Sequence, residues 1–487
     1  MKVEPIKMVE NLYRAFESRK QAFKKIEDYY IGKTDAILNY TKTDRNNLKV
    51  SCNYLKKFIK EEVAYSVGNP ITYTSKSGDF SVAERIDLVI DNFPQNHDVD
   101  LFTNEVLFGI VYEVRYIDKH GRLKVKCLKP TEAYHEEDHE GDIEYFIHVY
   151  DQKEYDEEGV ERTVKYIDYY TDENVQIYRY DTDFSLLNVI PHYFDEIPVG
   201  MAKISNYIEK DTLYSDIKTI QDAIETNLSD VVNEISDFRN AYLVITGLTI
   251  TDTEAEKFKT NGIIEVPDTE GKAEWLIKEI NDTFVQNTLK NLQEKIYEIT
   301  SHINHNDAKI LSNASGIALK SRMIALMQRC DINEGAFQEL VLSRLRVISK
   351  YLQISESKGF DIKDVNIKFT PMIPSDDATT AEMLRSLDGK LSLETGLSLL
   401  SFVEDGKLEA QRLFHETSRK DALKEVINDV RSRESFIAEY GEGNGEFAKI
   451  LNEKSKLEGA TVSEFATLNT SDENDEEGDE DDNADEE

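Results

Sequence analysis

The stretch Asn313 to Arg322, NASGIALKSR, ends in a Lys-Ser pair of the kind that closes a phosphate-binding P-loop. A P-loop requires G-x-x-x-x-G-K-[ST], because its two glycines let backbone N–H groups wrap the phosphates. Here Ala314 and Leu319 occupy the two glycine positions. The polar run HNDAKILSN also replaces the strand that leads into a P-loop. We therefore expect no nucleotide site.

A second stretch, His135 to His139, reads HEEDH and matches the zinc-peptidase motif H-E-x-x-H. That spacing works on a helix, where residues i and i+4 share a face and both imidazoles reach one ion. Here the stretch lies between strand-like segments and beside Gly141, and no third ligand is evident. We expect a polar hairpin connection. A zinc metallopeptidase using His135, Glu136 and His139 remains the alternative.

A third group, His302, His305 and Asp307, lies close together at the end of an expected helix. It reads as a polar helix end, with a weak metal or pH-sensing site as the alternative. No Ser/His/Asp arrangement and no G-x-S-x-G is present. We expect a protein that is not an enzyme and that binds no cofactor or metal.

The charge of the 487-residue chain argues against a freely accessible nucleic-acid-binding surface. Its formal net charge is -37, whereas such surfaces are normally basic. Residues Ser471 to Glu487 hold twelve acidic residues and no basic one, which predicts a disordered tail. That tail either solvates the protein, attracts a basic partner or repels DNA.

Cysteine usage and hydropathy predict a soluble intracellular protein without a membrane span. The three cysteines, Cys52, Cys127 and Cys330, are far apart and suggest a reducing compartment. The first twenty residues lack the apolar core of a signal peptide, and no run of about 18 apolar residues occurs.

Apolar periodicity predicts an α+β protein that is mainly helical. Apolar residues at steps of three and four predict helices up to about Tyr30, over 53–67, 212–238 and 282–304, and over about 316–353. Val, Ile and Tyr runs between 107 and 180 predict an antiparallel meander. Two long amphipathic helices thus flank a small α/β module, residues 239–281, and further helices follow Pro374.

The order of these segments resembles the portal proteins of tailed bacteriophages, of the type found in siphophages of Gram-positive hosts. The segments that carry the resemblance are YYIGKTDAI, NYLKKFIKEEVAYSVGNPITY, IPVG, the helix–module–helix insert, SNASGIALKSRM, VNIKFTPMIP and LSLETGLSLL. Each motif is loose, and their order and spacing from about residue 11 to 416 make the case.

The resemblance implies the portal fold, with wing, stem, clip and crown, assembled as a ring. The implied parts are the wing (1–210), two stem helices (211–238 and 282–304), the clip (239–281), the tunnel loop (305–315), a long helix and strand returning to the wing (316–374), the crown (375–457) and the acidic tail (458–487). A lone amphipathic helix cannot bury its apolar stripe, whereas copies in a ring can do so against each other.

The resemblance also implies a function. Twelve subunits, or another count such as thirteen in isolation, surround a channel at one capsid vertex of the virion. Terminase drives double-stranded DNA in through this channel, and the DNA later leaves through it. The ring nucleates procapsid assembly in the host cytoplasm, which involves scaffolding and major capsid protein. It also docks the terminase large subunit and head-completion or tail adaptor proteins. A ring-forming structural protein without a DNA role is a further alternative.

The residues expected to approach the DNA lie on the tunnel loop and at the start of the helix after it. The loop residues are Asn306, Asp307, Lys309, Ser312 and Asn313, and the helix residues are Lys320 and Arg322. Lys309 is the only cation among these loop residues, and it is suited to brief contact with a DNA phosphate. Trp275, the single tryptophan, is expected in the core of the clip or on its docking surface.

Overall fold

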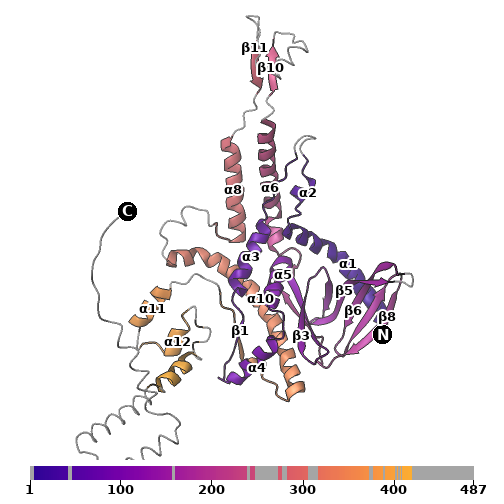
Figure 1. Ribbon diagram of the computed structural model, residues 1–487, viewed down its shortest axis with the longest axis vertical. Coiled ribbons are helices and arrows are strands. Elements are labelled where there is room, and N and C mark those ends of the chain that lie inside the picture. The colour runs from indigo at the N-terminus through magenta and orange to yellow at the C-terminus, as the bar shows by residue number, and fades with distance from the viewer. Residues whose placement is uncertain are drawn as a thin grey trace, which may run out of the picture. The chain divides into compact units, whose positions relative to one another are not determined.

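The computed structural model describes most of the first 420 residues. The described residues are 5–41, 47–155, 159–238, 242–246, 272–276, 282–304, 316–371, 377–387, 390–400, 403, 406, 409–418 and 420. The chain divides into two units, Met1–Thr379 and Thr380–Glu487. Figure 1 shows the elements in the labels used below.

The helices of the first unit confirm the expected ones and add three. They are α1 (Pro5–Tyr30), α2 (Asp35–Asn39), α3 (Tyr54–Val67), α4 (Phe80–Ile90), α5 (His97–Phe108), α6 (Leu213–Phe238), α8 (Asp282–Thr300) and α10 (Gly316–Glu356), with a short 3-10 turn η1 (Ile362–Asp364). Helices α2, α4 and α5 were not predicted. Asn53 caps α3 by accepting a hydrogen bond from the Lys56 N–H, as its residue type favours.

Helix α5 ends at a glycine that no other residue could replace without strain. Gly109 has φ +76°, and a Cβ there would lie 2.7 Å from the carbonyl oxygen of Ile208. This position therefore needs both the left-handed backbone and the missing side chain. The chain turns directly from α5 into strand β2.

The strands form four antiparallel sheets instead of one meander. The strands are β1 (Thr72–Ser75), β2 (Ile110–Ile117), β3 (Leu123–Leu128), β4 (Ala133–Glu137), β5 (Ile143–Tyr155), β6 (Glu161–Tyr170), β7 (Asn174–Tyr180), β8 (Phe184–Pro191), β9 (Val199–Lys203), β10 (Tyr242–Thr246), β11 (Lys272–Leu276) and β12 (Val365–Lys368). The sheet orders are β3-β2-β9, β4-β5-β6-β7-β8, β1-β12 and β10-β11. Strands β4 and β8 were not predicted.

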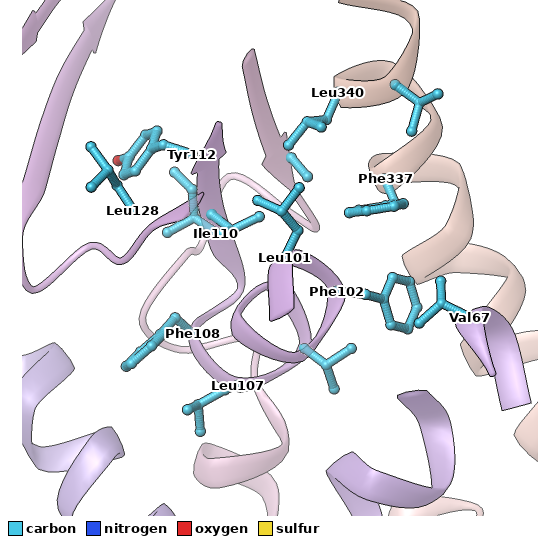
Figure 2. Close-up of a cluster of buried hydrophobic side chains, with 14 of the residues drawn as sticks. Val67, Leu101, Phe102, Leu107, Phe108, Ile110, Tyr112, Leu128, Phe337 and Leu340 are labelled. Carbon is cyan, nitrogen blue, oxygen red and sulfur yellow. The ribbon is translucent and has the colours of Figure 1, made fainter. Parts of the chain in front are cut away.

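Helix α10 runs through the first unit as its central support. It has 41 residues, about 60 Å at 1.5 Å per residue, and extends three residues past the expected end. It packs on α3, α4 and α5 (Figure 1) and also on β9. The rings of Phe102 on α5 and Phe337 on α10 lie 5.3 Å apart between centroids, and Figure 2 shows Val67 of α3 beside Phe102. The contact between the rings joins residues more than 230 positions apart.

The second unit contains helical residues, as expected for the region after Pro374. Helix α11 (Asp377–Ser386) crosses the division between the units, and α12 (Leu393–Leu397) follows it. Residues 409–418 are also helical. Ser392 caps α12 through its hydroxyl, which accepts the Thr395 N–H.

Candidate functional site: the surroundings of residues 305–315

The five expected DNA-facing loop residues, Asn306, Asp307, Lys309, Ser312 and Asn313, lie outside the described residues. The backbone places Lys320 and Arg322 in the first two turns of α10. Trp275 lies on β11, opposite Leu243 of β10. The structure thus describes the elements on either side of residues 305–315, and these define the candidate site.

The chain entering this region is anchored by a buried histidine. His302 follows α8 and is 6% exposed. Its ring stacks on Phe58 of α3 at 4.2 Å between centroids. Its Nδ1 lies 2.9 Å from the Thr300 carbonyl oxygen and its Nε2 lies 3.2 Å from that of Phe58. His302 is thus a polar residue at the end of α8, as expected, but a buried one, while His305 and Asp307 lie outside the described residues.

The chain leaving this region is anchored where α10 meets α3. Leu326 and Cys330 of α10 are buried against Tyr65 of α3. Arg329, the residue directly before Cys330, lies between two carboxylates. Its Nη1 is 3.4 Å from Asp216 of α6, and its Nε is 2.9 Å from Glu62 of α3. The described chain before and after residues 305–315 thus contacts the same helix, α3.

Glu62 is the centre of this arrangement, which we call the Glu62 cluster: Glu62, Asp216, His302, Arg329 and Asn333. Asn333 Nδ2 donates to Glu62 Oε2 at 2.8 Å. Glu62 Oε1 and Arg329 Nε are close, yet both are buried and neither has an aligned hydrogen-bond partner among the described residues. Glu62 itself is 0% exposed.

Burial shifts the pKa values of two groups in the cluster. Burial raises the pKa of Glu62 to about 7, although Arg329 and Asn333 act to lower it. Burial lowers the pKa of His302 to about 3, so its imidazole is neutral at physiological pH. The carboxyl group of Glu62 therefore keeps its proton to a higher pH than an exposed glutamic acid does.

A second buried carboxylate, Glu113 on β2, was not predicted and holds α10 to the sheet. We call His97, Asp98, Glu113, Arg115 and Arg344 the Glu113 cluster. Arg115 Nε donates to Glu113 Oε1 at 2.8 Å, and Arg344 Nη2 donates to Oε2 at 2.6 Å. His97 Nε2 lies 2.8 Å from the same Oε2, and Arg344 Nη2 also donates to Asp98 Oδ1 at 2.6 Å.

The Glu113 cluster is charged and closely built. Burial alone would raise the pKa of Glu113, but Arg344, Arg115 and His97 hold it well below its usual range. A Cβ on Gly200 of β9 would lie 2.0 Å from Arg115 Nη2, so the guanidinium occupies the space of that missing side chain. Gly200, the glycine of the IPVG segment, thus leaves the space that the Arg115 guanidinium occupies.

Helix α6 carries a buried polar stripe that binds the chain before α3 and the start of α3. Gln221, Glu225, Ser229 and Asn233 recur every four residues and are 0–1% exposed. We call them the α6 ladder. Their oxygens accept the backbone N–H groups of Leu55, Cys52, Val50 and Leu48, respectively, at 2.9–3.1 Å. The sequence shows this four-residue spacing of polar residues, but the prediction for this helix used only its apolar stripe.

The ladder is reinforced by residues before it in the chain. Thr34 and Ser51 donate to Glu225, and Tyr40 donates to Asp230 at 2.8 Å. Tyr29 donates to Asp222, which also pairs with Lys218 at 3.2 Å. Helix α6 is therefore held along its length by polar contacts, while α8 packs beside it (Figure 1).

The HEEDH stretch is a strand and a turn, which corrects the expected hairpin connection in part. Residues 133–137 form β4, and only Asp138–Asp142 make the turn. Buried His135 lies with Nδ1 2.8 Å from the Tyr112 hydroxyl and Nε2 3.1 Å from Glu137. His139 is 89% exposed in the turn. The helical face that would join two zinc-binding histidines is absent from this described segment, so the geometry does not support a metallopeptidase.

One acidic group in the described part of the chain has the spacing of metal ligands. Carboxylate oxygens of Asp138, Glu140 and Asp142 lie within 4.8 Å of one another in the β4–β5 turn. Asp138 Oδ1 already accepts the backbone N–H groups of Glu140 and Asp142.

Among the helices that the structure describes, none is both long and apolar enough to cross a membrane.

Known proteins similar to this chain identify its family. A profile described as "Phage portal protein, SPP1 Gp6-like" matches residues 10–422. The chain belongs to this family of phage portal proteins. It is 23% identical over 422 residues to the portal protein of Bacillus phage SPP1, covering 81% of each chain. A solved chain from the neck of an empty GTA particle, computed with C6 symmetry, is 10% identical with a TM-score of 0.40, covering 71% of this chain and 88% of that one.

The family assignment confirms the expected resemblance and the broad α+β class. Phage portal proteins are structural components of the virion capsid. The structure combines helices and antiparallel strands, with the long helices expected on either side of residues 239–281 and after 315. The parts named wing, stem, clip and crown remain predictions.

Proposed function

We propose that this chain forms a ring around a DNA channel at one capsid vertex. In this proposal, terminase packages double-stranded DNA through the channel, and the DNA leaves through it on ejection. The ring has twelve subunits, nucleates procapsid assembly, and docks terminase and head-completion or adaptor proteins. The observation that carries the proposal is the family match over residues 10–422.

The paired helices α6 and α8 support the ring. They are the proposed stem, and they pack on each other. Yet Val232 and Ile235 of α6 and Ile299 of α8 are 36–57% exposed. Apolar side chains on a long helical pair are best covered by neighbouring copies of the same pair. Residues 1–210 and 316–374 then form the wing, 239–281 the clip and 375–457 the crown.

The Glu62 cluster supports a tunnel loop at 305–315. His302 before this segment and Arg329 after it both contact α3, so the described chain on either side is held by the same helix. In this proposal the segment meets the DNA backbone briefly through Lys309, while the net charge of -37 per chain discourages tight binding.

Deletion of Lys309 to Asn313 tests the channel role. We expect the deleted chain to assemble rings of normal mass and to package less DNA with terminase. A twelve-subunit ring of 56.0 kDa chains has a mass of about 670 kDa, measurable by native mass spectrometry. Normal packaging by the deleted ring would reduce the segment to a connector. A wild-type chain that forms rings without supporting packaging would favour a ring-forming protein without a DNA role.

The proposed clip is tested separately through Trp275. Replacing Trp275 by alanine should weaken binding of the ring to terminase and the tail adaptor if the side chain belongs to the docking surface. Rings of Trp275→Ala that bind both partners normally would assign the tryptophan to the core of the clip or to neither role. The thermal stability of the variant distinguishes these two.

A further inference from the structure

Arg329 of α10 is shared between carboxyl groups on two other helices. Its Nη1 and Nη2 donate to Asp216 Oδ2 of α6 at 3.4 and 3.5 Å, and its Nε lies 2.9 Å from Glu62 Oε1 of α3. The hydrogen bonds to Asp216 are long, and the closer contact with Glu62 is not aligned, since neither atom has a hydrogen-bond partner among the described residues. One guanidinium thus joins three helices without good hydrogen bonds to either carboxyl group.

Glu113 shows how an ionised carboxylate is held elsewhere in this chain. Its two oxygens accept aligned donors from two arginines at 2.8 and 2.6 Å, as charge-assisted hydrogen bonds do. Glu62 is equally buried, yet the guanidinium beside it directs its Nη groups at Asp216. This arrangement is the one expected when Glu62 is protonated and Asp216 carries the negative charge that pairs with the guanidinium.

The groups that face Glu62 from α10, from α6 and from the chain after α8 are Arg329, Cys330, Asn333, Asp216 and His302. Of these five, only the guanidinium and the carboxyl group of Asp216 carry charge, because burial raises the pKa of the thiol and lowers that of the imidazole to about 3. On α3 itself, Lys57 already pairs with Glu61 at 2.6 Å. Glu62 and Asp216 therefore share one positive charge.

Burial decides which of the two carboxyl groups holds a proton. Glu62 is 0% exposed, whereas the side chain of Asp216 is 38% exposed. Ionisation costs most where water is excluded, so the proton remains on Glu62 while Asp216 is charged. Burial raises the pKa of both groups above their usual values, that of Glu62 to about 7. Glu62 therefore gains its charge within the range of pH in which proteins usually work.

We propose that Arg329 changes its partner when Glu62 gains or loses its proton, and so connects α10 either to α6 or to α3. With Glu62 protonated, Arg329 donates to Asp216, as in this structure. When Glu62 ionises, the guanidinium turns to form aligned hydrogen bonds with it, and the contact with Asp216 opens. One proton thus selects which helix holds the N-terminal third of α10.

The exchange takes place within one chain and requires neither a ring nor DNA. In the proposed ring, α6 belongs to the stem and α3 to the wing, so the exchange changes which of these parts α10 is attached to. A chain without the exchange can still form a ring and package DNA, and a chain that forms no ring can still show the exchange. The failure of one proposal is therefore distinguishable from the failure of the other.

Structures of the full chain at about pH 5.5 and about pH 8.5, below and above the transition of Glu62, test the exchange directly. At the lower pH we expect Arg329 to donate to Asp216. At the higher pH we expect aligned hydrogen bonds of about 2.8 Å from Arg329 to Glu62, with Asp216 farther than about 4 Å away. An Arg329 that keeps the same partner at both pH values overturns the exchange.

Glu62→Gln and Asp216→Asn shift the balance in opposite directions, with Glu61→Gln as the matched control. Glu62→Gln has no charge to attract Arg329, which should donate to Asp216 at both pH values. Asp216→Asn removes a charge that opposes the ionisation of Glu62, so the exchange should move to lower pH. Glu61→Gln alters the neighbouring glutamate of α3, which pairs with Lys57, and should behave as wild type. An exchange that persists in Glu62→Gln overturns Glu62 as its cause.

Infrared difference spectra between the two pH values test the proton itself in solution. We expect wild type to lose, at the higher pH, a carbonyl band of a protonated carboxyl group that Glu62→Gln lacks at both pH values. Identical difference spectra for the two chains would overturn the exchange, because Arg329 has no cause to leave Asp216 unless Glu62 ionises. This measurement needs no structure of a variant.

Discussion

Glu113 and Glu62 are both fully buried, each beside an arginine of α10, and yet they behave oppositely. Glu113 accepts hydrogen bonds from Arg115 and Arg344 and lies beside His97, and its pKa is held well below the usual range. Glu62 has one aligned donor, Asn333, and its pKa is raised to about 7. The charges of two buried guanidiniums outweigh the burial of Glu113, whereas the single, partly exposed guanidinium of Arg329 does not outweigh that of Glu62.

The two clusters lie at different places along α10. The Glu113 cluster joins the C-terminal half of the helix to β2 and α5, where the core is most densely buried. The Glu62 cluster lies near the helix start, beside residues 305–315. The comparison suggests a fixed support at one end of α10 and a weaker attachment at the end that faces the proposed tunnel loop.

The largest expected effect comes from breaking the fixed cluster. Arg344→Ala leaves Glu113 with one guanidinium in a buried site, and loss of one partner of such a pair costs about 3–5 kcal/mol in the free energy of unfolding. Arg346→Ala, on the exposed side of the same helix, should cost less than about 0.5 kcal/mol. Denaturant unfolding measures both. Equal losses of unfolding free energy in the two variants would show that the Glu113 cluster contributes no more to stability than an exposed position on α10.

Glu62→Gln should remove a pH dependence. An exposed glutamic acid has a pKa of about 4.3, so as the pH rises the unfolded chain loses this proton before the folded chain does. The contribution of Glu62 to stability is therefore full below about pH 4 and is lost as the pH passes about 7, a change of about 3 kcal/mol. Wild type should thus lose stability relative to Glu62→Gln between these values. A constant difference across this range would contradict the raised pKa.

Asn333→Ala should destabilise the Glu62 cluster further. The substitution removes the single aligned donor to Glu62, with an expected cost of about 1–2 kcal/mol. It should also raise the pKa of Glu62 further, which extends the loss of stability to higher pH. The double variant with Glu62→Gln is the control, because it has no carboxyl group to titrate. A pH dependence that persists in the double variant would assign it to another group.

Asp98→Asn should have the smallest effect of the four. Asp98 pairs with Arg344 at 2.6 Å, but its side chain is 26% exposed and Arg344 retains Glu113. We expect a cost of about 0.5–1 kcal/mol, measured by thermal or denaturant unfolding. A loss as large as that of Arg344→Ala would move the centre of the fixed cluster from Glu113 to Asp98.

The sequence predicted the long helices well because their apolar residues repeat within each segment. Expected ends of α1, α3, α6 and α10 agree with the observed ones within a few residues. Such a repeat is local information. Strand β4 was missed because its HEE residues look like a turn, although His135 is buried by Tyr112 of a different sheet.

The buried polar residues could not be predicted from the same signal. In β2 both faces are buried, so the alternation of Tyr112, Glu113 and Val114 does not show which face meets solvent. Glu113 is buried because Arg344, 231 positions away, packs against it. The α6 ladder likewise depends on backbone groups 166–185 positions earlier. The expected loop residues 306–313 stay predictions, since they lie outside the described residues.

The α6 ladder has a consequence for the length of the segment that it binds. Four residues of helix advance about 6.0 Å, whereas two residues of an extended chain advance about 6.6 Å. Leu48, Val50 and Cys52 give two such intervals, so the mismatch reaches only about 1.2 Å before α3 begins at Tyr54. Because the two repeats differ in length, the helix and the extended segment match only at one relative position along their axes. Residues 48–55 therefore set the axial position of α6, and one residue inserted between Leu48 and Cys52 should shift it.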